Sequence, residues 1–179
     1  MCLARFCSFA LVLSLFSAVP LLAQKEKREP LTAAEIEKIR EAGIDPSERV
    51  KIYTKVVEEH VATIKGLTSR KNSAARAHRL DDELQDLTAL MDELGSNLDV
   101  YTDRHADIRA PLKPLSEAAQ RWLSTLRALA GEAGFDLSRK EAIESGQDLA
   151  DQAERLLREQ TEYFNLHKDE RGQDRAEPK

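Results

Sequence analysis

Apolar residues recur at intervals of three and four along most of the chain between residues 32 and 167. In the clearest stretch, the spacing alternates between four and three without a break: Leu80, Leu84, Leu87, Met91, Leu94, Leu98 and Tyr101. This spacing puts the apolar side chains on one stripe of an α-helix, and a sustained form of it is typical of coiled coils. No useful length of chain alternates apolar and polar residues as a half-buried strand does. The pattern therefore predicts an all-α fold.

Capping residues mark where the first helices begin. Thr32 and Glu35 fit a capping box, in which each side chain accepts a hydrogen bond from a free backbone N–H of the first turn. They predict a short helix that ends at Gly43. Asp45 followed by Pro46 predicts the start of a second helix. Its apolar stripe is formed by Val50, Tyr53, Val57, His60, Ile64 and Leu67.

The stripes of the second helix and of a third, which begins at Ser73, match each other. If the chain reverses near Asn72, they pair as an antiparallel hairpin requires: Ile64 with Leu80, His60 with Leu84, Val57 with Leu87, Tyr53 with Met91 and Val50 with Leu94. The same matching predicts a second antiparallel hairpin near the C-terminus: Leu129 with Ile143, Leu123 with Leu149, Ala119 with Ala153 and Leu115 with Leu157.

The chain between residues 101 and 130 has two interpretations. The spacing of three and four between apolar residues continues through it. This continuity favours one kinked helix over residues 73–130 and an elongated rod. Pro111 and Pro114 interrupt helix hydrogen bonding and favour a turn near Arg109 followed by a fourth helix. Val56 and Val61 broaden the stripe of the second helix beyond a two-stranded seam. The expected fold is therefore an antiparallel up-down bundle of four long helices plus the short N-terminal helix.

Residues 32–167 are accordingly expected to form one helical domain. Asp136 or Ser138 is expected to cap its last helix, and Phe135 to close the end of the bundle. Residues 24–31, which are charged and contain a proline, are expected to be a flexible leader. The charged residues 168–179 are expected to be a disordered tail.

Residues 1–23 have a short basic start, an apolar middle and a small residue, Ala23, before charge begins, which is typical of a cleaved secretory signal peptide. An uncleaved anchor is the alternative, although the apolar run is slightly shorter than the roughly 20 residues of a membrane span. Cleavage would remove Cys2, Cys7 and Arg5, which changes the net charge from −5 to −6. We therefore expect a protein exported through the inner membrane, periplasmic or secreted, with no transmembrane span after processing.

The expected mature chain offers few reactive groups. Without cysteine it has no disulfide, thiolate nucleophile or thiolate-bound zinc. No histidine stands three residues after a glutamate, so the ligand pairs of di-iron helical bundles are missing, and neither serine-hydrolase nor phosphate-loop motifs occur. The acidic net charge argues against nucleic-acid binding. We expect no enzyme activity, no cofactor and no metal.

Two histidines, His60 and His105, fall on the apolar stripes. A histidine inside a core changes charge near neutral pH, so both are candidates for a pH-sensitive core. The alternative is a histidine at the edge of the core that makes one hydrogen bond.

Charged residues gather in two places around the predicted first hairpin. A cationic group at its tip could contact an anionic lipid, another envelope polyanion or a partner, or could be ordinary turn polarity: Arg70, Lys71, Arg76 and Arg79. An acidic group follows in the first turns of the third helix, where the helix dipole favours negative charge: Asp81, Asp82, Glu83 and Asp86. Its spacing does not fit a calcium loop, so we interpret it as a solvated helix face.

The five residues from Leu31 to Glu35, Leu-Thr-Ala-Ala-Glu, resemble the Leu-Thr-x-x-Gln motif of small periplasmic chaperones. Glu35 stands where that family has glutamine, and a capping box alone produces the same letters. The family's members are usually more basic and form curved dimers. The resemblance does not identify the chain as a member.

These features lead to one functional hypothesis and one alternative. The hypothesis is a non-enzymatic protein of the bacterial envelope that binds a protein partner or associates with itself. The alternative is a ligand- or metal-binding helical bundle whose site is assembled from scattered side chains.

Overall fold

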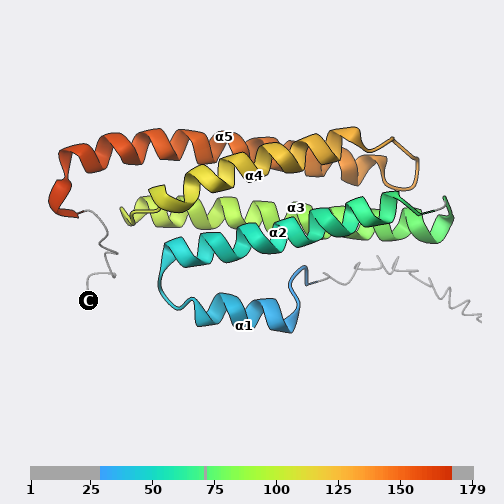
Figure 1. Cartoon of the computed structure of the whole chain (residues 1–179), viewed down its shortest axis with the longest axis horizontal. Coiled ribbons are helices and arrows are strands. Elements are labelled where there is room, and N and C mark those ends of the chain that lie inside the picture. The colour runs from blue at the N-terminus through green and yellow to red at the C-terminus, as the bar shows by residue number, and fades with distance from the viewer. Residues whose placement is uncertain (1–28, 71, 171–179) are drawn as a thin grey trace, which may run out of the picture.

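The computed structural model describes residues 29–70 and 72–170, and this part of the chain is all-α, as predicted. It contains five α-helices and one short 3-10 helix, shown in Figure 1: α1 (Ala33–Glu41), α2 (Pro46–Thr68), α3 (Ala74–Asp103), α4 (Arg109–Ala128), α5 (Asp136–Leu166) and η1 (Lys168–Glu170). No strand occurs among these residues. The predicted signal peptide, residues 1–23, lies outside the described residues. Of the predicted disordered tail, residues 168–170 instead form η1.

The capping residues act as predicted in the first two helices, and Ser73, the predicted start of the third, is its cap. Thr32 and Glu35 form the complete capping box of α1, Asp45 caps α2 with Pro46 at its first position, and Ser73 caps α3. The predicted cap of the last helix is wrong. α5 has no side-chain cap, and Asp136 is its first residue.

Residues 73–130 form two helices, not one kinked helix. α3 ends in a Schellman motif, in which Ala106 N–H bonds the carbonyl of Tyr101 and His105 N–H bonds that of Thr102. His105 occupies the left-handed position of this motif, with φ of 55°. The turn therefore comes before both prolines.

The two prolines lie inside α4. Pro111 is the third residue of the helix, where a backbone N–H has no partner within the helix. Pro114 lies deeper and removes one helix hydrogen bond. Neither residue therefore ends a helix.

Each of the two predicted hairpins brings its helices into contact, α2 with α3 and α4 with α5. In the first, Tyr53 donates to Glu93 and His60 lies against Glu83, both within two residues of the predicted pairing. In the second, Ser116 donates to Glu154 and Arg127 to Gln147, again within two residues of it.

The two hairpins contact each other through α3 with α5 and through α2 with α4. Both contacts are between parallel helices. Successive residues of α3 pair with successive residues of α5: Asp81 with Ser138, Asp92 with Ser145 and Asp99 with Gln152. α3 and α4 do not contact each other although only five residues separate them. The helices thus contact in the cyclic order α2, α3, α5, α4, which is compatible with the predicted bundle.

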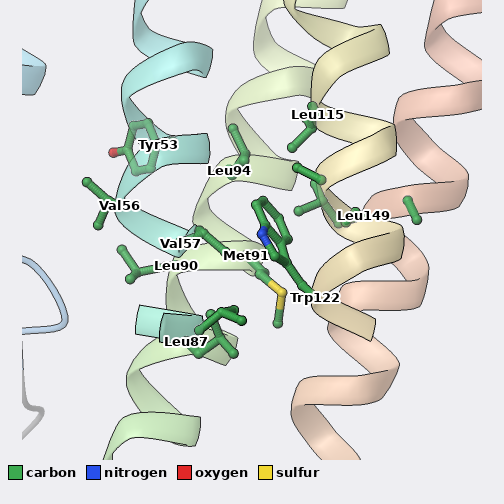
Figure 2. Packing of buried hydrophobic residues seen from close by; sticks show 14 of the residues in the cluster. Tyr53, Val56, Val57, Leu87, Leu90, Met91, Leu94, Leu115, Trp122 and Leu149 are labelled. Atoms are coloured by element: carbon green, nitrogen blue, oxygen red, sulfur yellow. The ribbon is translucent and has the colours of Figure 1, made fainter. Parts of the chain in front are cut away.

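Apolar side chains from all four long helices fill the space between them. Figure 2 shows Trp122 of α4 beside Met91 of α3 and Leu149 of α5. Phe135, in the turn before α5, is buried as predicted. Gly146 lets α5 lie close to α3 and α4 here. A Cβ at this position would lie 3.2 Å from Leu123 and 3.5 Å from the Met91 sulfur. The core therefore combines large apolar side chains from all four helices with a close approach of α5 at Gly146.

Helix α1 lies outside this group and contacts α2 alone among the helices. Ile39 is buried against α2, and Leu31, just before α1, packs on the same apolar cluster. No helix within residues 29–170 is both long enough and apolar enough to cross a membrane.

Candidate functional site

His60 lies on α2 at the edge of the core, where α1 and α3 both approach it. Its Nδ1 is 2.8 Å from Oε1 of Glu83 on α3, and the His60 and Glu83 side chains are only 14% and 17% exposed. Asp86, one turn further along α3, is buried, and so is Glu35 of α1. One imidazole is therefore in contact with a carboxylate of α3, in a region where α3 and α1 each bury a further carboxylate.

The pKa of His60 lies above its ordinary value. Burial alone would lower it, because burial disfavours the charged imidazolium. The close contact with Glu83 and the attraction of Glu83, Glu35 and Asp86 outweigh burial and raise the pKa. The cluster consequently favours protonated His60.

Glu35 has a pKa below its ordinary value. Burial would raise it, but the hydrogen bonds from the Thr32 hydroxyl (2.7 Å) and backbone N–H (2.6 Å), together with the attraction of His60 and Lys38, lower it. The capping box therefore also holds a carboxylate in its charged form near His60.

The prediction that His105 belongs to the core is wrong. The apolar phase continues past the end of α3, but the Schellman turn carries His105 out of the stripe and leaves it exposed. Its ring stacks on Tyr163 of α5, with centroids 4.6 Å apart, and Tyr163 also stacks on His167.

Gln160, which sequence reasoning missed, forms hydrogen bonds with the backbone of the turn that contains His105. It is buried on α5, and its amide donates to the Ala106 carbonyl and accepts from the Ile108 N–H, at 3.0 and 3.1 Å. A buried glutamine on an apolar helix face signals such a role, but only the structure shows which backbone groups it satisfies.

The predicted cationic group does not form one exposed patch. Arg76 is buried, with 6% exposed, and pairs with Glu132 between α4 and α5. Arg70 and Arg79 are exposed, and Lys71 lies outside the described residues. Arg76 instead lines a hollow of about 500 Å³ at this end of the molecule, together with Lys65, Thr68, Asn72, Ser124, Thr125, Ala128, Leu129, Ala130, Glu132 and Phe135.

The acidic group on α3 is only partly a solvated face. Asp86 is buried, which corrects that interpretation. Asp81 accepts hydrogen bonds from Ser138 of α5 (2.5 Å) and from Gln85 (2.8 Å). Ligand atoms of His78, Asp81 and Asp82 lie within 4.8 Å of one another, so these three side chains could approach one cation.

Charge is unevenly divided between the long helices. α3 carries eight acidic and two basic residues, or −6, and α5 carries eight and four, or −4. α2 carries three acidic and four basic residues, or +1, and α4 carries one and four, or +3. We call the side formed by the neighbouring helices α3 and α5 the α3–α5 face, and the opposite side the α2–α4 face. Over all their residues, α3 and α5 together total −10 and α2 and α4 together total +4.

Along the α3–α5 face, acids accept hydrogen bonds from neutral donors. Ser138 donates to Asp81, Ser145 to Asp92 at 2.6 Å, and Gln152 to Asp99 at 2.7 Å. Hydroxyl and amide donors hold these carboxylates in place without adding positive charge. The face therefore remains strongly acidic.

No protein-family model, no curated protein and no solved structure matches this chain.

Proposed function

We propose that this chain is an exported, non-enzymatic helical protein that binds another protein, and that the α3–α5 face receives a basic surface of that partner. The charge separation carries the proposal: −10 on α3 and α5 against +4 on α2 and α4. A face of one sign attracts an oppositely charged partner over a distance and orients it before contact.

The proposal includes a fold in which the four long helices form one antiparallel up-down bundle over residues 32–167. The cyclic order of contacts, α2, α3, α5, α4, supports this arrangement. In such a bundle the acidic and basic faces point in opposite directions. Small-angle scattering of the processed protein would test it, because a rod would give a much larger radius of gyration than a compact domain of this length.

A binding experiment with matched charge reversals tests the acidic face. Glu141 and Asp148 of α5 are exposed and share the side of the helix that carries Ser138 and Ser145. We expect E141K/D148K to weaken binding of a fluorescent poly-lysine peptide in 150 mM salt more than tenfold.

The control for this variant is E37K/E41K on α1, which changes net charge equally on two exposed residues away from the α3–α5 face. It should weaken binding only slightly. Equal losses in both variants would show that total charge decides binding and would reject the face as the site.

Export is tested by the N-terminus of the protein recovered from bacterial cells that produce the full chain. We expect mass spectrometry of the periplasmic fraction or the medium to find a chain that begins at Gln24. A chain of full length held in the membrane fraction would instead support the anchor.

A small-ligand function is the second candidate, and the hollow of about 500 Å³ beside Arg76 favours it. Arg76 lines this hollow, and its Nε is buried without a hydrogen-bond partner. A thermal-shift series with inorganic phosphate and small carboxylates would test it. A shift that disappears in T125V, a near-isosteric change in the lining, would support this function, and no shift at millimolar concentration would reject it.

A further inference from the structure

Helix α1 is attached to the rest of the molecule by a small contact. Its nine residues bury Glu35 and Ile39, whereas Ile36 is 36% exposed. Next to this contact, a hollow of about 480 Å³ between α1 and α2 is lined by Lys38, Glu41, Ala42, Asp45, Glu48, Ile52, Lys55, Val56 and Glu59. A nine-residue helix is unstable alone, so α1 depends on its contact with α2.

The charged groups around His60 come from the helices on either side of it. Glu83 of α3 contacts it at 2.8 Å, and the buried carboxylates of Glu35 on α1 and Asp86 on α3 attract it. Lys38, also on α1, acts on Glu35. α4 approaches α2 on another side, where Arg121 pairs with Glu58 at 3.0 Å. His60 therefore contacts a carboxylate of α3 and is attracted by a buried carboxylate of α1 and another of α3.

We propose that protonation of His60 holds α1 against α2, so that α1 is a latch that loosens as the pH rises. With His60 charged, Glu35 is attracted to the site. When His60 loses its proton, Glu35 faces the acids of α3 without the intervening positive charge. Loosening of α1 uncovers the side of α2 that carries Ile52 and Val56.

The direction of the pH dependence follows from the two pKa shifts. The pKa of His60 is raised above 6.5, so its contribution to holding α1 is complete below about 6.5 and is lost as the pH rises through the folded-state pKa. The pKa of Glu35 is lowered, so its contribution is present above its unfolded-state pKa and is lost as the pH falls through the folded-state value. α1 is held most tightly between these two transitions.

Hydrogen exchange of the α1 backbone tests the latch directly. In the full-length protein, the protection factors of residues 36–41, corrected for intrinsic exchange, should fall about fivefold or more between pH 6 and pH 8.5, the lower end of usual coupling between sites. H60Q should remove this pH dependence. Should H60Q not fold, E83Q removes the nearest partner and should reduce the dependence.

An NMR titration of His60 supplies the reciprocal measurement. A fivefold coupling requires that loss of the Glu35 charge lowers the His60 pKa by about 0.7. E35Q removes the charge and keeps a residue suited to the capping box. E37Q is the matched control, because Glu37 is exposed on the same helix and pairs with Arg40; it should leave the His60 pKa nearly unchanged.

Two results would overturn the proposal. One is protection of α1 that does not change with pH in the unmodified protein. The other is a pH dependence that survives in both H60Q and E83Q, since another group would then control α1.

Discussion

Two parallel helix contacts join the hairpins, and they are built differently. Between α3 and α5, Asp81, Asp92 and Asp99 accept hydrogen bonds from neutral donors on α5. Between α2 and α4, the corresponding link is an exposed ion pair of Glu58 with Arg121. An ion pair cancels charge where it forms, whereas a hydroxyl or amide donor does not. The contact between α3 and α5 therefore keeps the negative charge of its aspartates, whereas the ion pair cancels one charge of each sign between α2 and α4.

The glycines of α3 and α2 also differ in what surrounds them. Gly95 of α3 allows the Gln152 amide to reach its backbone carbonyl, at 3.0 Å, and a Cβ there would lie 3.0 Å from the Gln152 Oε1. Glycine in a helix costs about 1 kcal/mol relative to alanine, and at Gly95 it permits this hydrogen bond. Gly66 of α2 has no comparable neighbour, because a Cβ there would meet nothing within 4 Å.

The largest expected loss of unfolding free energy comes from a larger side chain at Gly146, where α5 lies close to α3 and α4. Gly146→Val would force a branched side chain against Leu123 and Met91, and overpacking of this kind costs about 1–3 kcal/mol of unfolding free energy. Urea unfolding followed by circular dichroism measures it. Gly66→Val is the matched control and should change stability by only a few tenths of a kcal/mol, since it alters helix propensity alone. Equal losses in the two variants would mean that α5 is not closely packed at Gly146.

A smaller loss of unfolding free energy is expected from removing one of the neutral hydrogen-bond donors between α5 and α3. Ser138 is buried, so Ser138→Ala should lower the free energy of unfolding by about 1 kcal/mol through the lost hydrogen bond to Asp81. Ser145→Ala removes an exposed bond of the same kind and should cost less. A neutral result for Ser138→Ala would show that this hydrogen bond does not secure the contact between α3 and α5.

The smallest effect is expected at the contact between α2 and α4. The side chains of Arg121 and Glu58 are 63% and 45% exposed, and exposed pairs contribute about 0–1 kcal/mol. A double-mutant cycle with Arg121→Ala and Glu58→Ala should give a coupling within that range that declines in high salt. A larger coupling would contradict the difference between the two contacts.

The sequence predicts well which helices pair in each hairpin, because the apolar stripe that decides the pairing can be identified within each helix alone. The stripes of α2 and α3 specify which sides meet, and the observed contacts of Tyr53 and His60 fall within two residues of the predicted pairing. Helix starts are equally local, since Thr32, Asp45 and Ser73 cap the residues directly after them.

What the sequence did not predict depends on helices that are distant along the chain. The apolar phase runs unbroken through His105, so it cannot show that a Schellman turn reverses the chain there. The acidic composition of α3 and α5 is visible in the sequence, but a face appears only once α5 is known to lie beside α3 and not beside α2. Burial of Arg76 likewise depends on Glu132, 56 residues away.

The Gln160 amide also bears on the order in which the protein folds. Its partners, the Ala106 carbonyl and the Ile108 N–H, are 54 and 52 residues away in the chain and lie in the segment that connects α3 to α4. Each hairpin consists of local contacts that form quickly, whereas this bond must wait for the C-terminal part of α5 to arrive. The backbone before α4 therefore remains hydrated until the C-terminal part of α5 packs beside the start of α4, and Gln160→Ala should speed unfolding more than it slows folding.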